Sequence, residues 1–431
     1  MEASILDSSE LANPGLPTQL RRCHDCDLLL ELGDIPWGGR ALCSRCGAVL
    51  FVNRVDPVGR ALALHLAALV LWVVANAFPF MTLKLEGREQ ASVLFSSVLF
   101  LYRDGLWPLA LVVFLFVILF PLGKILLNLG VLVAMRLNWR PPFLGRLYRV
   151  VETLHPWAMT EVFLLGVLVA YAKLLDIATI EIGPSMIAFV GLIVTLIAAG
   201  AAFHPSHVWD HVQLPPKSTE KETDPDDLIG CHACELVCRV ADHSDDQEAI
   251  CPRCGAALHR RKSNSLQRSW ALALAAVILY IPANVYPVMT VISFGRGDPS
   301  TILGGVEELF HAGMWPLGLL VLFASITVPV LKLIGLSYLL ISVRRGSHDR
   351  LRERTVLYRI VEAVGRWSMI DIFMLSILVA LVRLGSIATI EPGVGAISFA
   401  GVVVLTMFAA MSFDPRLIWD AAGENSERSN H

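Results

Sequence analysis

Eight of the nine cysteines form two sets whose spacing suits a bound metal ion. Each set has the pattern C-x2-C-x16-C-x2-C, and the second set follows the first after 208 positions. Two CxxC turns at that separation can place four thiolates around one tetrahedral ion. The predicted ligands are Cys23, Cys26, Cys43 and Cys46 in the first set, and Cys231, Cys234, Cys251 and Cys254 in the second.

Zinc is the expected cofactor at both sites, because the spacing is that of a zinc ribbon. A rubredoxin-like iron site uses similar turns, so the spacing leaves iron open. Two disulfides are the other alternative, which a cytoplasmic location disfavours. Closed sites of this kind are structural, so we do not expect the metal to catalyse a reaction. Cys238 has no counterpart in the first half and is interpreted as a spare thiol.

The cysteine sets alternate with long apolar segments that must position them. Of 431 residues, 55% are hydrophobic and 17% are charged, whereas an average soluble domain is about 25% charged. A membrane-spanning helix needs roughly 20 mostly apolar residues. Eight segments qualify, at about 61–80, 107–135, 157–175, 185–203, 269–289, 315–343, 367–384 and 394–413. This composition excludes a purely soluble enzyme and a disordered chain.

The apolar segments repeat together with the cysteines. The motif "ANAFPFMT" at 75–82 recurs as "ANVYPVMT" at 283–290, and "LYRVVE" at 147–152 recurs as "LYRIVE" at 357–362. Four spans return a chain to its starting side, so the two units are parallel repeats. The predicted fold is an all-α integral membrane protein with two parallel repeats, each a four-cysteine zinc-ribbon module followed by a four-helix membrane domain.

The repeats divide the chain into five predicted segments. They are an N-terminal zinc ribbon at 1–56, a first membrane domain at 57–210, a linker with the second ribbon at 211–262, a second membrane domain at 263–420 and a tail at 421–431. The loops at 136–156 and 344–366 hold four and seven arginines. Because arginine-rich loops stay on the cytoplasmic side, both termini and both ribbons should be cytoplasmic. No cleaved signal peptide is expected at the start.

Charged residues within the predicted spans are costly and are therefore candidates for function. Counting about 1.5 Å per residue along each span places Lys124 and Glu161 at similar depths in the cytoplasmic half. Lys332 and Asp371 occupy the equivalent places in the second repeat. We predict two ion pairs, Lys124–Glu161 and Lys332–Asp371. The favoured interpretation is that these pairs fix helix packing; the alternative is that each lysine reaches for the membrane surface.

Other polar residues differ between the repeats and are the candidate transport residues. Lys173 and Asp176 lie one helical turn apart at the outer end of the third span, whereas Arg383 in the second repeat has no such acid. Ser325 and Thr406 are predicted near the middle of the bilayer. This set could form a proton relay or a gate. The alternatives are that Lys173 marks the membrane boundary and that the hydroxyls bond to their own helices.

Taken together, the two cysteine sets, the two four-helix domains and the paired motifs "ANxxPxMT", "GxWPL" and "WxMxxxF" resemble the paraquat-inducible protein A family. The resemblance covers nearly the whole chain. It implies a bacterial inner-membrane protein that works with a periplasmic MCE-domain protein. In that family the MCE protein forms a tunnel, and the membrane protein loads or unloads phospholipids at its base, which supports the integrity of the envelope.

Three classes of function follow from these observations. The first is a lipid transport subunit, with phospholipids and an MCE-domain protein as partners. The alternative is a membrane-bound thiol or metal sensor that uses the four-cysteine modules as redox switches. A membrane enzyme is disfavoured, because no Walker A, H-E-x-x-H or G-x-S-x-G motif is present. The net charge of −3 gives no case for a nucleic-acid partner.

Overall fold

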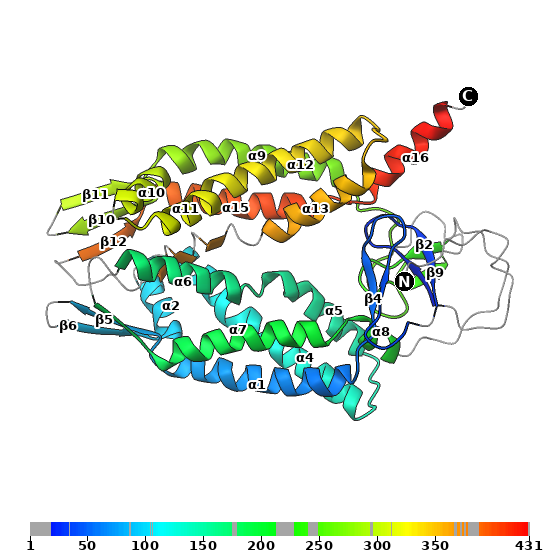
Figure 1. The fold of residues 1–431 in the computed structure, drawn as a ribbon, viewed down its shortest axis with the longest axis horizontal. Coiled ribbons are helices and arrows are strands. Elements are labelled where there is room, and N and C mark those ends of the chain that lie inside the picture. The colour runs from blue at the N-terminus through cyan, green and yellow to red at the C-terminus, as the bar shows by residue number, and fades with distance from the viewer. Residues whose placement is uncertain are drawn as a thin grey trace.

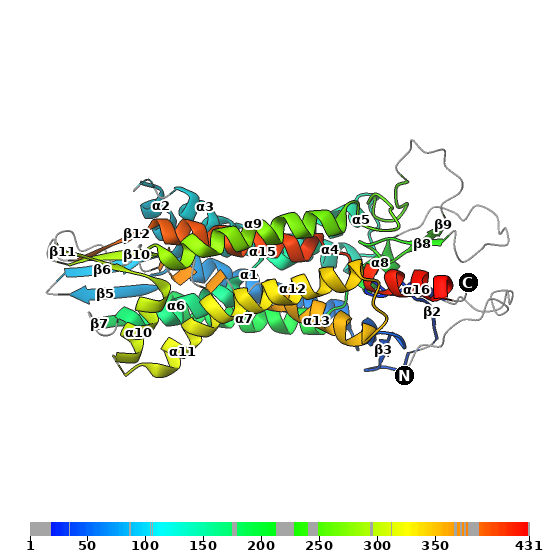
Figure 2. The same ribbon diagram turned by 90° about the horizontal axis from the view of Figure 1, so that it is seen from above.

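The computed structural model describes residues 19–33, 35–85, 88–103, 105, 107–174, 179–212, 228–239, 249–293, 296–311, 313–365, 369–370, 373–374, 376–377 and 388–429. Two bundles of helices lie side by side along the length of the molecule (Figure 1). Small β-modules that contain the cysteines lie at one end, and two β-sheets lie at the opposite end (Figure 2). We call these the module end and the sheet end.

The first helical domain follows the first cysteine module. Its helices are α1 (Pro57–Ala77), α2 (Leu94–Arg103), α3 (Trp107–Val113), α4 (Phe120–Arg136), α5 (Leu144–Leu154), α6 (Thr160–Leu174), α7 (Pro184–Ala202) and α8 (Ser206–His211). Asp56 begins α1 by accepting a hydrogen bond from the Gly59 N–H, and Pro57 occupies the first turn, where its missing N–H costs nothing. A 3-10 turn at His155–Trp157 joins α5 to α6.

The second helical domain repeats this order. Its helices are α9 (Ser265–Val285), α10 (Ile302–His311), α11 (Trp315–Leu322), α12 (Val328–Arg344), α13 (Leu351–Gly365), α15 (Val394–Ser412) and α16 (Leu417–Ser429). Seven helical segments of the described chain are long and apolar enough to cross a membrane. The remaining predicted span, 367–384, lies largely outside the described residues. The chain is therefore a multi-pass helical membrane protein, as predicted.

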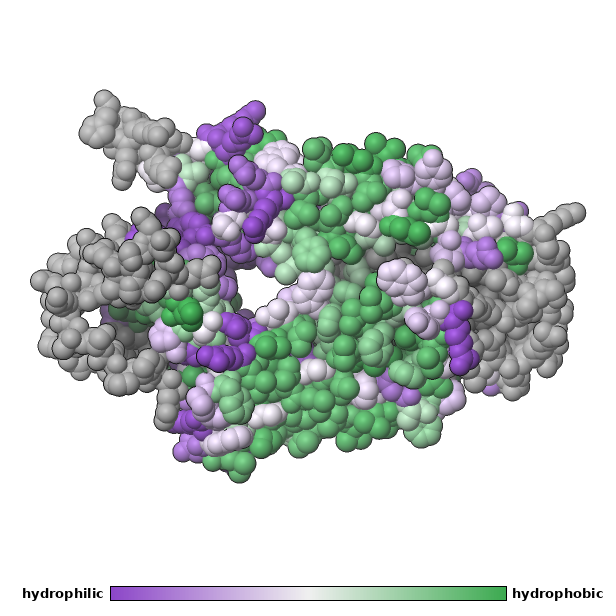
Figure 3. Space-filling view, turned by 180° about the vertical axis from the view of Figure 1, so that it is seen from behind, coloured by the Kyte–Doolittle hydropathy of each residue, from purple (hydrophilic) through white to green (hydrophobic). Residues whose placement is uncertain are grey.

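On the face drawn in Figure 3, hydrophobic residues form a broad band across the two helical domains, and hydrophilic residues gather toward both ends. Long side chains such as Ile187, Val194 and Ile397 are more than 60% exposed on this band. A soluble protein rarely exposes so large an apolar surface. In a membrane the same surface faces lipid tails. This is the physical reason that the sequence contains so few charged residues.

Each second span contains a π-helical turn that a proline explains. The π-turns are Phe114–Leu119 between α3 and α4, and Phe323–Thr327 between α11 and α12. Pro329 has no N–H to donate to the carbonyl four residues earlier, at Ser325. The helix widens there, and the Val328 N–H bonds to the carbonyl of Phe323, five residues back. Such turns are frequent at functional sites.

Small three-stranded sheets, which the sequence did not predict, cover the sheet end. The first has the order β6-β5-β7 and the second β11-β10-β12, all antiparallel. Their strands are β5 (Met81–Leu85), β6 (Arg88–Ser92), β7 (Thr179–Ile182), β10 (Met289–Ser293), β11 (Arg296–Ser300) and β12 (Ala388–Pro392). In each sheet a hairpin after the first span pairs with a strand before the fourth span. The sheets therefore tie the loops of each repeat together.

The cysteine modules are made of short antiparallel hairpins. The first contains β1 (Gln19–Arg22), β2 (Leu29–Leu32), β3 (Arg40–Leu42) and β4 (Val49–Val52). In the second, β8 (Leu228–Gly230) pairs with β9 (Val237–Arg239), and a single bridge joins Ile250 to Ala257. Both modules lie at the same end of the molecule, as parallel repeats with four spans each require.

The modules pack crosswise on the helical domains. Cysteines of the first module share a hydrophobic core with Ala273, Leu336, Phe413 and Trp419 of the second helical domain. Cysteines of the second module share one with Val131, Leu144, Tyr148 and Trp209 of the first helical domain. Each repeat therefore contributes the module that covers the other repeat's helices. This exchange links the two halves more tightly than the chain connection alone.

Candidate functional site

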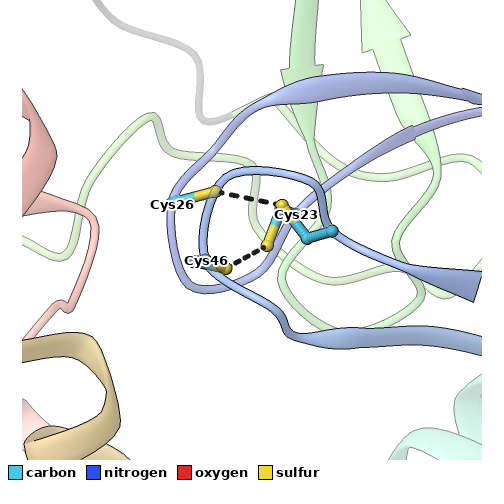
Figure 4. Close-up of side chains that lie close together, drawn as sticks. Cys23, Cys26 and Cys46 are labelled. Carbon is cyan, nitrogen blue, oxygen red and sulfur yellow. Dashed lines mark hydrogen bonds between the residues drawn. The ribbon is translucent and has the colours of Figure 1, made fainter. Parts of the chain in front are cut away.

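Each predicted cysteine set forms one compact, buried cluster. The sulfur atoms of Cys23 and Cys46 are 3.4 Å apart, and those of Cys26 and Cys43 are 3.5 Å apart. Figure 4 shows Cys23, Cys26 and Cys46 with their sulfur atoms turned toward one another. The second set is equivalent, and within each set all four sulfurs lie within 4.8 Å of one another. All eight side chains are at most 3% exposed.

These clusters fit a tetrahedral metal ion. Zinc–sulfur bonds of about 2.3 Å imply sulfur atoms about 3.8 Å apart in a tetrahedron. The observed pairs at 3.4–3.5 Å and the limit of 4.8 Å bracket that value. A disulfide would need about 2.05 Å, and all nine cysteines are free thiols. Four thiolates select zinc or iron over harder cations, so either metal fits the donor set.

Local backbone geometry turns each pair of cysteines toward the centre. In the first turn the Asp27 N–H bonds to the Cys23 carbonyl, and the Cys23 N–H bonds to the Leu28 carbonyl. The residue after the second cysteine of each turn has a positive φ, between 57° and 72°; these residues are Asp27, Gly47, Glu235 and Gly255. Glycine adopts this conformation without strain, which explains the glycine in "CSRCG" and "CPRCG".

Close packing of the sulfur atoms shifts the pKa of individual thiols in both clusters. A hydrogen bond from Cys23 lowers the pKa of Cys46 to about 7. In the second cluster a hydrogen bond from Cys234 lowers the pKa of Cys231 to about 7. The thiolate is the form of cysteine that binds a metal.

Helix α13 of the second domain bonds directly to the first cluster. The Arg359 guanidinium pairs with Asp25 at 2.6 Å and donates to the Cys46 carbonyl at 3.3 Å and to the Cys46 sulfur at 3.4 Å. A cation beside a tetrathiolate site offsets the surplus negative charge of the site and orients its ligands. Arg45 stacks on Trp419 of α16, with its guanidinium 4.4 Å from the ring centre.

Partly buried charges fix the junction between the modules and α16. Arg261 donates to Asp27 at 2.7 Å and to Asp420 at 2.5 and 2.7 Å. Arg21 of the first module pairs with Glu235 of the second at 3.0 Å. Hydrogen bonds to Asp420 outweigh the effect of burial and raise the pKa of Arg261. The two modules are therefore fixed to each other as well as to the helices.

The second module rests on α5 and α8 of the first domain. Trp209 packs edge-on against Tyr148, with ring centres 5.3 Å apart. Gly145, in the first turn of α5, lies so close to the Arg253 carbonyl that any β-carbon there would clash with it. This close approach requires glycine and places Cys254 directly over the helix. Local sequence patterns did not indicate this contact, because it joins residues more than 100 positions apart.

The extra thiol of Cys238 lies at the second cluster. In strand β9, Cys238 pairs with Ile229, as Leu30 pairs with Arg21 in the first module. Leu30 is fully buried beside the first cluster, and Cys238 packs against the core that contains the second cluster. The second module thus holds a fifth sulfur where the first holds a leucine. Sequence comparison of the repeats identified the difference but not its place.

Lys332 and Thr406 form a buried polar pair inside the second domain. Lys332 is 3% exposed, and its ammonium donates to the Thr406 hydroxyl at 3.0 Å. Thr406 donates in turn to the Val403 carbonyl at 3.0 Å. The sequence placed these residues on different spans at different depths and did not foresee the bond. Burying an ammonium among apolar helices is costly, so such a group is a functional candidate.

Ser325 adds a second polar point on the same span. Its side chain is fully buried, and its hydroxyl has no hydrogen-bond partner among the described residues. It lies in the π-turn that Pro329 causes, seven residues before Lys332. Two helical turns separate the residues, so both face the interior of the domain. An unsatisfied buried hydroxyl calls for an explanation, such as a bound polar group.

The remaining predicted residues are placed only in part. Glu161 is exposed and its carboxylate accepts a hydrogen bond from Thr160 at 3.4 Å, while Lys124 is half-buried. Lys173 is in the last turns of α6, but its side chain is not described. Asp176, Asp371 and Arg383 lie outside the described residues. The two predicted ion pairs and the relay around Lys173 therefore stay predictions.

Comparison with known proteins identifies the family. The sequence profile of the paraquat-inducible protein A family matches residues 58–213 and again 266–423. The chain belongs to this family. The two matches in the paraquat-inducible protein A profile confirm the internal repeat and the predicted resemblance. No solved structure matches the chain.

Curated relatives span nearly the whole chain. "Intermembrane transport protein PqiA" of Escherichia coli K12 is 35% identical over 415 residues, which are 95% of this chain and 97% of that protein. "Lipophilic envelope-spanning tunnel protein A" of the same strain is 30% identical over 410 residues, or 95% of this chain and 93% of that protein. A "probable intermembrane transport protein" of Haemophilus influenzae is 28% identical over 432 residues, or 96% and 98%. These relatives are named as transport or tunnel proteins rather than enzymes.

Proposed function

We propose that this protein is the inner-membrane subunit of a bacterial lipid transport system. It loads or unloads phospholipids at the base of a periplasmic MCE-domain tunnel and so supports envelope integrity. The observation that carries this proposal is the buried ammonium of Lys332 inside a helical membrane domain. The chain also aligns over 95% of its length with a relative that is named for intermembrane transport. It has no catalytic role.

In this proposal the module end is cytoplasmic and the sheet end is periplasmic. Arginine-rich helices such as α13 adjoin the modules, as the positive-inside rule requires. The two sheets then face the periplasm, where an MCE-domain protein would dock. The metal at each module is structural zinc, held by the four cysteines already described. It fixes the modules that tie the two helical domains together.

The polar residues of the second domain are the proposed transport residues. Lys332, Thr406 and Ser325 would form a gate or relay that responds to a lipid or a proton passing through the domain. Lys173, Asp176 and Arg383 would extend this relay toward the periplasmic side. The alternative role of Lys332, with Asp371, is a packing pair equivalent to Lys124 and Glu161.

Purification from native membranes tests the proposal. The full-length protein would be isolated without crosslinking, and its lipids and protein partners identified by mass spectrometry. Co-purified phospholipid together with an MCE-domain protein is the expected result. Recovery of metal alone, with neither lipid nor such a partner, would contradict the transport role.

A thiol or metal sensor is the second candidate, because the second cluster has a fifth sulfur beside it. Oxidation of a ligand by peroxide gives a sulfenic acid, which Cys238 can convert to a disulfide with loss of water. The metal would then leave. This candidate requires faster loss of zinc on peroxide treatment of the native protein than of Cys238→Ala. Equal rates would leave only the transport role.

A further inference from the structure

A cavity of about 240 Å³ opens where the two helical domains face each other. In Figure 3 the molecule is hollowed between these domains, on the side of the modules. Polar groups line one part of the cavity, from His155, Arg359 and Glu362. Apolar groups line another part, from Met407, Ala410 and Met411 near the end of α15. A cavity with both kinds of wall suits an amphipathic ligand.

Gly365 forms a thin part of the cavity wall, and a buried cation lies behind it. A β-carbon at Gly365 would be 3.5 Å from the ammonium nitrogen of Lys332. Gly365 therefore leaves the Lys332 charge close to the cavity, although Lys332 itself is only 3% exposed. The residue equivalent to Gly365 in the first repeat is His155, 210 positions earlier, which lines the same cavity. The cavity thus lies where equivalent turns of the two repeats meet.

Charges around the cavity are of both signs. Arg359 and Lys332 supply two cations, one on the wall and one behind Gly365. Glu362 supplies an exposed carboxylate one helical turn after Arg359, on the same face of α13. A phosphate group can pair with the cations and an ammonium group can pair with the acid. A ligand with both groups a few bonds apart matches this arrangement better than a ligand with only one.

The level of the cavity in the membrane matches that of lipid headgroups. Met411 lies one residue before the end of α15, and its carbonyl accepts a hydrogen bond from Lys262 at 2.8 Å. The apolar span therefore ends here, and charged residues begin. Methionine side chains such as Met407 and Met411 adapt to flexible apolar ligands. Acyl chains could follow them along α15 toward the middle of the bilayer.

We propose that this cavity binds the headgroup of an amine-bearing, zwitterionic phospholipid of the inner leaflet. The phosphate lies between Arg359 and the Lys332 side of Gly365, and the primary ammonium donates hydrogen bonds to Glu362. The acyl chains lie along Met407 and Met411. This inference rests on the proposed lipid transport function and names the lipid class that the domain interface takes.

Arg359 gives the site a connection to the first metal cluster. The same guanidinium that lines the cavity donates to Asp25 and to the Cys46 sulfur. A phosphate that attracts Arg359 competes with those partners. Lipid binding therefore weakens the hydrogen bonds between α13 and the first module. Through these bonds, a bound lipid can change the position of the second helical domain relative to that module.

Lipid exchange on the full-length protein tests the inference. The purified protein would be equilibrated with vesicles of equal parts phosphatidylethanolamine, phosphatidylglycerol and phosphatidylcholine, and the bound lipids counted by native mass spectrometry. We expect phosphatidylethanolamine to be enriched over both others. Phosphatidylcholine has no ammonium hydrogen to donate, and phosphatidylglycerol has no cation. Soluble glycerophosphoethanolamine at the same concentration is expected not to displace the lipid, because it lacks acyl chains.

Glu362→Gln removes the acid without changing its size. It is expected to reduce the preference for phosphatidylethanolamine over phosphatidylglycerol about tenfold, because it removes one charge-assisted hydrogen bond. Glu353→Gln on the same helix is the matched control, since Glu353 is exposed and does not line the cavity. An unchanged preference in Glu362→Gln would overturn the inference.

Gly365→Ala covers the Lys332 ammonium with one methyl group. The new β-carbon would make ordinary contact with Lys332 at 3.5 Å, and alanine favours a helix, so the fold is expected to persist. Binding of all three phospholipids should weaken several-fold. Gly130→Ala on α4 is the control, because nothing lies within 4 Å of the added carbon.

If lipid still co-purifies but neither Glu362→Gln nor Gly365→Ala changes its composition or amount, the headgroup site is wrong and the transport role stands. If the native protein carries no phospholipid at all, both proposals fail.

Discussion

Lys124 and Lys332 are equivalent residues in the two helical domains, and their surroundings differ. Lys332 is buried and bonds to Thr406, while Lys124 is half-buried. On the facing turn the second repeat has Gly365, where the first has the larger His155. The first repeat has Val117 in its π-turn, where the second has Ser325. A duplicated domain has therefore kept its scaffold in both copies and concentrated buried polarity in the second.

The two cysteine clusters also differ in their surroundings. The first cluster receives a hydrogen bond from Arg359, and a buried leucine packs beside it. The second cluster has Cys238 at that place. A neighbouring cation stabilises a thiolate site, whereas a spare thiol offers a route for exchange or oxidation. The comparison teaches that equal ligand sets do not make equal sites.

Loss of a cysteine ligand has the largest expected effect. Cys23→Ser and Cys231→Ser should each lower the amount of folded protein severely, because each site holds a module that has little core of its own. Bound zinc, measured by elemental analysis, should fall from two ions to one. Cys238→Ser is the control and should retain two ions. Full zinc content in Cys23→Ser would disprove a four-cysteine site there.

Replacement of the two lysines compares the helical domains directly. Lys332→Met should abolish complementation of an envelope-defective strain, because it removes the buried cation of the proposed transport site. Lys124→Met should retain most activity, since its repeat has Val117 in place of Ser325 and His155 in place of Gly365. Membrane levels of both variants would be measured by immunoblot. Equal loss in both variants would show that the repeats are functionally alike.

Replacement of the arginine on α13 compares the metal clusters. Arg359→Ala should increase the rate of zinc loss to a chelator about tenfold, because outer hydrogen bonds orient metal ligands. Arg149→Ala, the equivalent change on α5, is the matched control. The measured quantity is the rate constant of the faster phase of zinc release from the purified protein. The same rate in Arg359→Ala and the native protein would mean that Arg359 acts only on Asp25.

Mild acid should destabilise the segment that follows α7 at His204, but not the equivalent segment that follows α15 at Asp414. This is the smallest of the expected effects. Burial lowers the pKa of His204 to about 4 in the first segment. At the equivalent place, burial alone would raise the pKa of Asp414, but hydrogen bonds from Arg416 lower it below its usual value. At pH values between about 4 and about 6.5, the usual histidine pKa, this histidine binds a proton more readily in the unfolded chain than in the folded protein. Stability from this segment is present above that window and is lost as the pH falls through it.

Hydrogen exchange at pH 7 and pH 5 would measure this difference. Amides of α8, beside the His204 contact with Phe51, should exchange faster at pH 5 after correction for the intrinsic rate. Amides at the start of α16 should be unaffected, because Asp414 stays ionised. His204→Gln should reduce the pH effect, and the part that remains comes from His207 in α8, whose pKa burial also lowers. Equal protection of α8 at both pH values in the native protein would contradict the assignment.

Much of the architecture could be predicted from local patterns. Spans depend on runs of apolar residues, and metal ligands depend on cysteine turns of fixed length, so both are encoded in neighbouring residues. The internal repeat then fixed the common end of both modules. The extramembrane strands at 81–92 and 289–300 were missed, because short polar hairpins beside a span carry little periodic signal.

The sequence alone determined the eight clustered cysteines, the apolar spans and their duplication, because each depends on spacing along the chain. Only the tertiary structure decided what those elements touch. It placed each module on the other repeat's helices, joined Lys332 to Thr406 across 74 positions, and brought Gly365 and His155 to one cavity. The physical reason is that helix packing and buried polar contacts depend on which faces meet, and one-dimensional periodicity does not specify the partner of a face.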